Sequence, residues 1–156
     1  IIVTKCPEDL SEAKKLVVRK KLKVSNNQKV YFSAIGYNEQ LKGNESVTVE
    51  QLKDKDLVLV TGIANPNPLL EYLKKKELKF THINFPDHHN FTNSDISKIE
   101  MTFDAIASES KLILTTEKDY MRLQGRISNL LYIAIETKFL AEEESFVSDI
   151  IGFIKS

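Results

Sequence analysis

Hydrophobic and polar positions alternate most regularly from Asp56 to the end of the chain. Four short apolar runs, each bounded by polar residues, have the pattern of buried β-strands: 57–60, 80–85, 112–114 and 130–135. The segments between these runs place apolar residues three or four positions apart, which predicts helices. Strands that alternate with helices indicate an α/β fold, in which a mostly parallel, Rossmann-like sheet carries helices on both faces in three layers.

The clearest predicted helix runs from Thr92 to about Glu109. Its apolar residues recur at helical spacing, and Thr92 with Asp95 three positions later forms a capping box. Three further helices are predicted from their own start signals: 66–76, 117–123 and 142–155.

The first 55 residues have a less regular pattern. Ile1–Lys5 predicts a buried strand, and Leu10–Leu22 predicts a helix with one basic face. Two later segments, 28–34 and 45–49, predict strands that pair with each other as a connector. We therefore expect three parts: 1–24 from a neighbouring domain, 25–55 as a short two-stranded linker, and 56–156 as the α/β domain. Because the chain opens inside a strand and without Met, we expect it to be a piece of a longer protein.

Composition narrows the class of protein. A hydrophobic share of 42% supports a buried core, and 22 basic residues balance 22 acidic ones, so no overall charge favours nucleic acid as a partner. The single cysteine, Cys6, excludes an intrachain disulfide and a cysteine metal cluster, and indicates a reducing compartment. No apolar run approaches the ~20 residues needed to span a bilayer.

The loop after the predicted strand at 80–85 carries the most reactive side chains. Asp87, His88 and His89 follow one another there, and an Asp–His pair can orient and move a proton near neutral pH. A plain turn with exposed histidines has the same composition. Manganese-dependent phosphoesterases carry a similar Asp-His-His segment, but they also need strand-end aspartates upstream, and the strand at 57–60 ends in Thr-Gly instead. We therefore predict no metal site here.

Two other loops follow predicted strands and belong to the same edge of the sheet. In the loop at 115–119, Thr116 can cap a helix together with Asp119, while Lys118 and the helix-start amides can meet a phosphate. In the loop at 61–66, Gly62 permits an unusual turn or the close approach of a ligand. Neither is a phosphate-binding P-loop, because Gly-x-x-x-x-Gly-Lys-Ser/Thr occurs nowhere in the chain.

Taken in order, the three loops resemble the tetraacyldisaccharide 4′-kinase family of lipid A biosynthesis in Gram-negative bacteria. The resemblance rests on Gly-Ile-x-Asn-Pro at 62–66 and on Asp-His-His at 87–89 with Phe91 and Asp95 after it. It closes with Thr-Thr-Glu-Lys-Asp at 115–119, followed by Arg122 and Leu123. The order and intervals suit the family, and the likeness extends over nearly the whole chain.

The resemblance implies an ATP-dependent kinase with two domains. An N-terminal P-loop domain would bind ATP and Mg, and residues 1–24 would be its remnant. The enzyme would transfer the γ-phosphate to the 4′-hydroxyl of its lipid substrate, tetraacyldisaccharide 1-phosphate, at the cytoplasmic face of the inner membrane. Because this chain has no P-loop, we expect it to bind no cofactor and to be inactive alone.

The resemblance also implies roles for single residues. His88 would be the catalytic histidine, with Asp87 beside it and His89 as the second choice, and it would work with an aspartate of the N-terminal domain. Four more residues would contact the substrate or its phosphate: Lys118, Glu117, Thr116 and Asn65.

Two questions stay open at the level of sequence. The basic face of the helix at 10–22 would either lie against anionic lipid at the membrane surface or be solvated. The chain as a whole would either be part of a kinase or be a non-catalytic Rossmann-like module, in which the three loops form a ligand-binding or interaction cleft.

Overall fold

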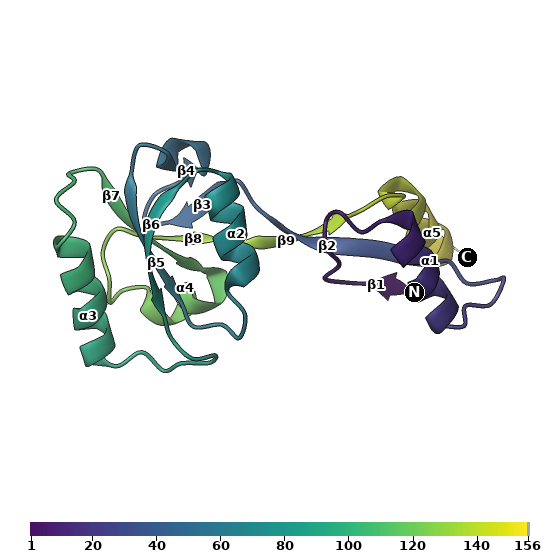
Figure 1. The fold of residues 1–156 in the computed structure, drawn as a ribbon, viewed down its shortest axis with the longest axis horizontal. Coiled ribbons are helices and arrows are strands. Elements are labelled where there is room, and N and C mark those ends of the chain that lie inside the picture. The colour runs from purple at the N-terminus through teal and green to yellow at the C-terminus, as the bar shows by residue number, and fades with distance from the viewer. Residues whose placement is uncertain (156) are drawn as a thin grey trace. The chain divides into compact units, whose positions relative to one another are not determined.

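The computed structural model describes residues 1–155, which divide into two compact units (Figure 1). Asn38–Ala134 form one unit, called here the central unit. Ile1–Tyr37 and the segment from Ile135 onward form the other, called the terminal unit. The expected boundaries at residues 25 and 56 do not coincide with these units, because the last strand and helix of the chain join the N-terminal segment.

The central unit is built on a six-stranded sheet in the order β4-β3-β8-β7-β5-β6. Four neighbouring strands are parallel: β5 (Asp56–Thr61), β6 (Lys79–Asn84), β7 (Lys111–Thr116) and β8 (Leu130–Ile133). Two short antiparallel strands extend the sheet beyond β8: β3 (Gln40–Gly43) and β4 (Val47–Thr48). The predicted α/β fold with a mostly parallel sheet is therefore confirmed.

Three α-helices connect the parallel strands: α2 (Asn67–Lys75), α3 (Asn93–Asp104) and α4 (Glu117–Leu123). A short 3₁₀ helix, Glu50–Leu52, precedes β5. The predicted capping box of α3 is present, because Thr92 and Asp95 exchange side-chain to backbone hydrogen bonds. The helix ends five residues earlier than predicted. Ile106 continues the apolar spacing and packs on the core from beyond the helix, which is why the pattern overestimated its length.

The core of the central unit lies on both faces of the sheet. Val58 and Val60 of β5 point to one face, where they join a buried cluster that includes Ile99 of α3 and Leu123 of α4. Side chains alternate along a strand, so Leu57 and Leu59 face the opposite side. The buried residues of α2 lie outside the first cluster, which places α2 on that opposite face. The sheet is thus covered by helices on both faces.

The order of the strands creates a switch point between β5 and β7. The chain leaves β5 through α2 to reach β6 on one side, and later returns through α3 to reach β7 on the other side of β5. From the carboxyl edge of the sheet, the chain therefore leaves β5 toward α2 on one face and β7 toward α4 on the other face. Open α/β sheets bind ligands at such a point.

The terminal unit contains a three-stranded sheet in the order β1-β2-β9. Its elements are β1 (Ile2–Val3), α1 (Glu12–Lys21), β2 (Tyr31–Tyr37), β9 (Ile135–Phe139) and α5 (Glu143–Lys155). The expected pairing of the 28–34 strand with the 45–49 strand is wrong. Instead β2 pairs antiparallel with β9, whereas β4 pairs with β3 in the central unit. Leu41 of β3 is fully buried, which gives that segment a place in the large sheet.

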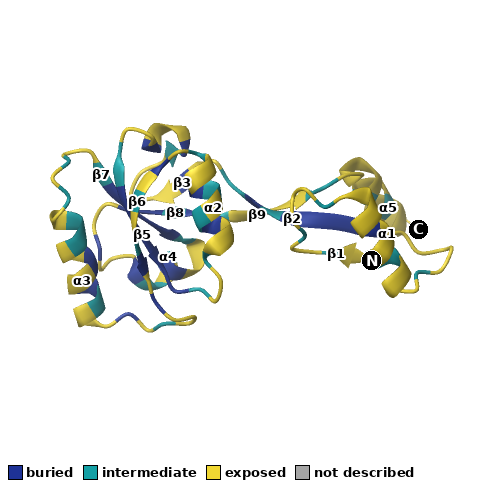
Figure 2. Ribbon diagram, viewed as in Figure 1, coloured by how far each residue is buried: buried dark blue, intermediate teal, exposed yellow. Residues whose placement is uncertain are grey.

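Exposed apolar side chains are concentrated in the terminal unit. Apart from Met101 and Met121, every large hydrophobic residue that is exposed among the described residues belongs to this unit. Helix α5 has no buried residue, although β2 beside it is buried along most of its length (Figure 2). Among the described residues, no helix has the length and apolar character needed to cross a bilayer.

Candidate functional site at the carboxyl edge of the central sheet

Three loops meet at the carboxyl edge of the parallel strands. One begins at Gly62 after β5, the second spans 85–92 after β6, and the third is the start of α4 directly after β7. Lys118 of α4 reaches the second loop and bonds to Asp87, while the amide of Gly62 bonds to Asp119. The structure thus brings together the loops that the sequence pointed to.

Asp87, His88 and Lys118 form an exposed polar cluster. The Lys118 ammonium donates to Asp87 Oδ1 at 2.9 Å, and its Nζ lies 3.5 Å from His88 Nε2. The same imidazole nitrogen is 3.6 Å from Asp87 Oδ2. The hydrogen bond from Lys118 is the largest influence that holds the pKa of Asp87 below its ordinary value, so this carboxylate is ionised at neutral pH.

His88 is exposed and has an unusual backbone conformation. Its φ of 58° lies in the left-handed region, which is uncommon for a residue with a side chain. The amide of His88 donates to Asp87 Oδ1 at 3.0 Å, so the preceding aspartate stabilises this turn. The resulting conformation leaves the imidazole 75% exposed. The His88 imidazole is therefore accessible from solvent.

His89 lies in a different environment from its neighbour. Its Nε2 is 2.9 Å from Asp95 Oδ2, and its ring stacks on Phe85 with 4.8 Å between centroids. Phe91 packs edge-on against the same imidazole. The hydrogen bond from His89 is the largest influence that lowers the pKa of Asp95, which falls to about 2. His89 thus ties the loop to the start of α3.

Two other predicted site residues take part in local hydrogen bonds. Thr116 caps α4, because its hydroxyl accepts from the amide of Asp119 at 3.2 Å. Asn65 Oδ1 accepts from the amide of Asn67 at 3.2 Å and so shapes the approach to α2. Glu117, by contrast, is exposed on the same turn of α4 as Lys118. Thr116 and Asn65 therefore stabilise the loops that carry the exposed groups.

Three residues that hold the site together were not recognised in this role from the sequence. Asp119 is fully buried and links α4 to the loop after β5. Arg122 was noted as part of the motif after residue 119, and its Nη1 donates to the carbonyl of His89 at 3.1 Å. Arg126 donates to the carbonyl of Phe91 at 2.6 Å. A sequence pattern cannot predict that a side chain will bond to a backbone carbonyl. The pattern Thr116-x-x-Asp119 was visible in the sequence, but it was interpreted only as a helix cap.

His82 is a structural histidine of the central sheet. Its Nε2 is 2.8 Å from Thr61 Oγ1, and the Thr61 hydroxyl donates to Asn84 Oδ1 at 3.0 Å. Because the single hydroxyl proton is used toward Asn84, Nε2 of His82 carries a proton and donates to Thr61. Burial lowers the pKa of His82, in keeping with a neutral ring. Among residues 1–155, no three His, Cys, Asp or Glu side chains are grouped so that they could hold a metal ion.

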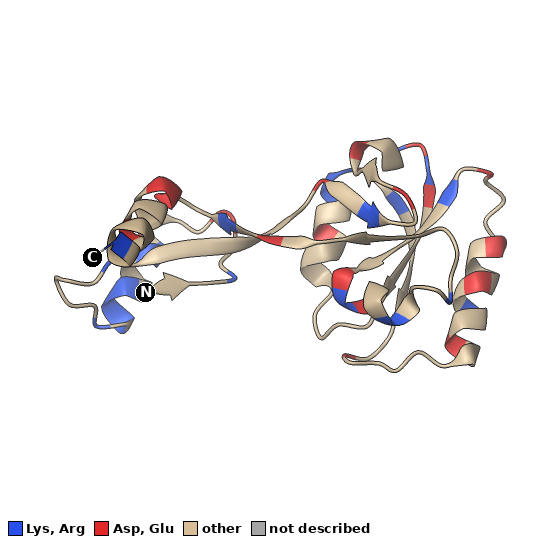
Figure 3. Ribbon diagram, turned by 180° about the vertical axis from the view of Figure 1, so that it is seen from behind, with Lys and Arg blue, Asp and Glu red and all other residues tan. Residues whose placement is uncertain are grey.

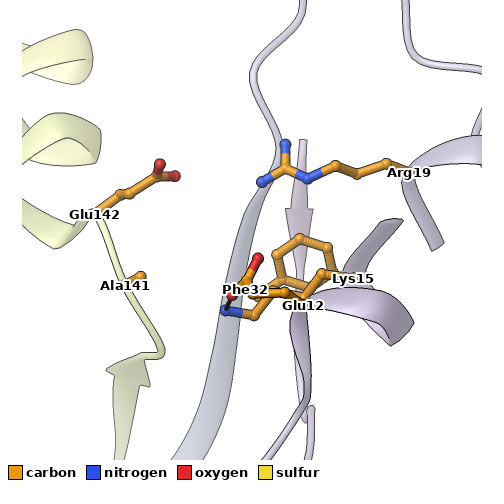
Figure 4. Close-up of a pocket in the computed structure, with 6 residues that line it drawn as sticks. All are labelled: Glu12, Lys15, Arg19, Phe32, Ala141 and Glu142. Atoms are coloured by element: carbon orange, nitrogen blue, oxygen red, sulfur yellow. Dashed lines mark hydrogen bonds and ion pairs between the residues drawn. The ribbon is translucent and has the colours of Figure 1, made fainter. Parts of the chain in front are cut away.

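A separate small pocket in the terminal unit is charged but balanced. It has a volume of about 50 Å³ and is lined by Glu12, Lys15, Arg19, Phe32, Ala141 and Glu142. Arg19 and Glu142 extend into it from opposite sides, and Lys15 bonds to Glu12 (Figure 4). Arg19 also packs over the ring of Phe32. A pocket of this size with two acids and two bases does not suit a nucleotide or a disaccharide.

Comparison with known proteins decides the family. The family model described as tetraacyldisaccharide-1-P 4′-kinase, LpxK, matches residues 2–155. The chain belongs to the LpxK family. A tetraacyldisaccharide 4′-kinase from Flavobacterium johnsoniae is 36% identical over 158 residues, which cover 99% of this chain and 44% of that protein. A tetraacyldisaccharide 4′-kinase from Bacteroides thetaiotaomicron is 33% identical over 174 residues, which cover 99% of this chain and 46% of that protein.

A solved LpxK structure has the same fold. The crystal structure of LpxK from Aquifex aeolicus in complex with ATP superposes with a TM-score of 0.56 and 21% identity, over 84% of this chain and 38% of that one. This chain therefore spans slightly less than half the length of the curated LpxK relatives it matches.

Proposed function

We propose that this chain is the C-terminal part of a tetraacyldisaccharide 4′-kinase, the ATP-dependent enzyme that phosphorylates the 4′-hydroxyl of tetraacyldisaccharide 1-phosphate in lipid A biosynthesis. The observation that carries the proposal is the LpxK family match over residues 2–155. The cluster of Asp87, His88 and Lys118 supports it, because it lies at the switch point where such sheets bind ligands.

His88 is the proposed acid–base residue of the phosphoryl transfer. Its imidazole is exposed and can accept the proton of a sugar hydroxyl, and Asp87 Oδ2 at 3.6 Å can stabilise the positive charge that follows. The aspartate of the N-terminal domain would be the second member of the acid–base pair. His89 is the weaker choice, because its Nε2 is engaged by Asp95 and its ring by Phe85.

Lys118 is the proposed contact to phosphate. Phosphoryl transfer is catalysed chiefly by positioning and by neutralising charge, and Lys118 offers a positive charge 3.5 Å from His88 Nε2. Glu117 on the same exposed turn would accept hydrogen bonds from sugar hydroxyls. Thr116 and Asn65 would act through the loop conformations they stabilise.

The remaining half of the protein would complete the terminal unit. Val147, Ile150, Ile151 and Ile154 form an exposed apolar stripe along α5. Strand β1 is an edge strand that pairs with β2 alone among the described residues. Exposed apolar surface of this kind marks an interface. Its proposed occupant is the N-terminal P-loop domain of the same protein, to which residues 1–24 would belong, and which would bind ATP and Mg.

The lipid substrate implies a membrane surface, and we place the reaction at the cytoplasmic face of the inner membrane. Several basic residues lie along α1 of the terminal unit (Figure 3). Lys14, Lys20 and Lys21 are exposed there and would attract anionic lipid headgroups.

A phosphoryl-transfer assay tests the proposal. The full-length protein is expected to phosphorylate tetraacyldisaccharide 1-phosphate with ATP and Mg, whereas the 156-residue chain is expected to show no turnover. Calorimetry should also show weak ATP binding, or none, by the chain alone, because it has no P-loop to supply converging amides and a lysine. Micromolar ATP binding by the 156-residue chain, or no transfer by the full-length protein, would contradict the proposal.

A further inference from the structure

Asp119 is a buried carboxylate at the switch point of the central sheet. Its side chain is fully buried, and Oδ2 accepts from the amide of Gly62 at 2.8 Å and from the Thr116 hydroxyl at 2.7 Å. A carboxylate in the first turn of a helix usually remains at the surface. This one turns inward and joins the start of α4 to the loop after the neighbouring strand, β5.

The second oxygen of Asp119 faces the loop that carries the histidines. Oδ1 has no hydrogen-bond partner among the described residues, and it forms an ion pair with Arg122, whose Nη1 lies at 3.6 Å. The same Nη1 donates to the carbonyl of His89 at 3.1 Å. A side chain at Gly62 would bring its Cβ to 3.1 Å from Oδ1 and 3.5 Å from the carbonyl of Pro86. All three loops of the site therefore meet around this carboxylate.

The position of Lys118 depends on this arrangement. Lys118 immediately precedes Asp119 on the first turn of α4, and its ammonium bonds to Asp87 in the loop after β6. Arg122 donates to the carbonyl of His89 in the same loop. The exposed ion pair between Lys118 and Asp87 would by itself hold the two loops together only weakly. The buried carboxylate joins the first turn of α4 to the loop after β5 through the Gly62 amide. Through Arg122, which donates to the carbonyl of His89, it is also linked to the loop after β6.

We propose that Asp119 is a positioning residue for the phosphoryl transfer, which sets Lys118 against Asp87 and His88 by joining the loops after β5, β6 and β7. The inference rests on the proposed function for its kinetic consequence. The cap of α4 does not require this carboxylate, because the Thr116 hydroxyl already accepts from the helix amide of Asp119. The carboxylate itself accepts from the Gly62 amide and the Thr116 hydroxyl.

A double-mutant cycle on turnover of the full-length protein tests the inference. Asp119→Asn keeps an acceptor for the Gly62 amide but removes the charge that faces Arg122, and should lower kcat by a factor of ~10 or more. If Asp119 acts through Lys118, the double variant Asp119→Asn with Lys118→Ala should turn over no more slowly than Lys118→Ala alone. If the losses in kcat of the two single variants instead multiply in the double variant, the inference is overturned. The control Ile99→Val removes one methyl group from the buried cluster of the central unit and changes no hydrogen bond of the three loops, so its effect should multiply with that of Lys118→Ala.

A structural readout separates this inference from the proposed function. In a crystal structure of Asp119→Asn, the distance from Lys118 Nζ to Asp87 Oδ1, now 2.9 Å, should exceed hydrogen-bonding reach. An unchanged distance would overturn the positioning role even if the protein is a kinase. A lengthened distance in a protein without kinase activity would support the link between the loops and reject only the proposed reaction.

Discussion

At the scale of single residues, the structure separates two neighbouring histidines. His88 is exposed beside Asp87 and Lys118, whereas His89 is held between Phe85 and Asp95. The sequence ranked His88 before His89 only through the family resemblance. The difference in their surroundings depends on the left-handed backbone at His88 and on ring stacking at His89. Neither property is encoded in residue types at fixed spacing. The box Thr92-x-x-Asp95 was visible, but its bond to His89 was not.

In the variant Asp95→Asn, the free energy of unfolding should depend less on pH between about pH 4 and pH 2 than in the wild type. The folded-state pKa of Asp95 is about 2, against an ordinary value of 3.8, so its ionised form stabilises the fold above about pH 4. That stabilisation is lost as the pH falls from about 4 toward 2. Urea unfolding at several pH values should show the variant less stable than the wild type at pH 7, with the difference disappearing near pH 2. A constant difference across this range would contradict the account. Asp104→Asn, at the exposed end of the same helix, is the matched control.

At the scale of elements, the regular strand–helix alternation predicted the central unit well. Strands β5 to β8 and helix α4 lie where the pattern placed them, because each presents apolar residues at the period of its own structure. The pairing of β2 with β9 was missed, since it joins segments about a hundred residues apart, and neither segment indicates its partner. Tyr31–Ala34 are buried on both faces of β2, which removes the alternation that marks a half-exposed strand.

Gly62→Ala should destabilise the protein by about 1–3 kcal/mol, the usual cost of overpacking a close-packed site. The added Cβ would lie 3.1 Å from Asp119 Oδ1. This oxygen cannot move without also moving Oδ2 of the same carboxylate, which accepts from the Gly62 amide. Gly152→Ala is the control, because nothing lies within 4 Å of its Cβ and it lies inside α5. That substitution should stabilise the protein by up to about 1 kcal/mol. Denaturant unfolding measures both, and equal effects would show that the space beside Gly62 is not limiting.

At the scale of the whole molecule, the two units differ in how completely they bury their apolar surface. The central unit has a covered sheet, whereas α1 and α5 of the terminal unit expose large aliphatic side chains. The chain spans 44% of the length of the Flavobacterium johnsoniae relative, and in the proposed function the N-terminal domain would cover the exposed surface of the terminal unit. The sequence grouped α5 with the central sheet, whereas the compact units group it with the N-terminal segment, since nothing local reveals that β9 returns the chain there.

Ile154→Ser should affect the full-length protein more than the 156-residue chain. Ile154 is 75% exposed in the described structure, so its loss should change the stability of this chain by no more than about 0.5 kcal/mol. If the N-terminal domain covers it, the same substitution should cost about 1–3 kcal/mol in the full-length protein, the transfer free energy of a buried aliphatic side chain. Met101→Ser, 72% exposed on α3 of the central unit, should have little effect in either. Identical small effects of Ile154→Ser in both proteins would show that this stripe is not the interface.

The most direct test of the account is the turnover of His88→Ala in the full-length protein. We expect kcat to fall by a factor of ~10² to 10⁴, the usual loss for an acid–base group. The free energy of unfolding should change by less than about 0.5 kcal/mol, because the His88 side chain is 75% exposed. Two variants serve as controls. His89→Ala should lower turnover less than His88→Ala does. Ile99→Ala should lower the free energy of unfolding by about 2–5 kcal/mol, because Ile99 is fully buried. Near-normal turnover of His88→Ala, or unfolding of the protein by this substitution, would contradict the assignment of His88 as the acid–base residue.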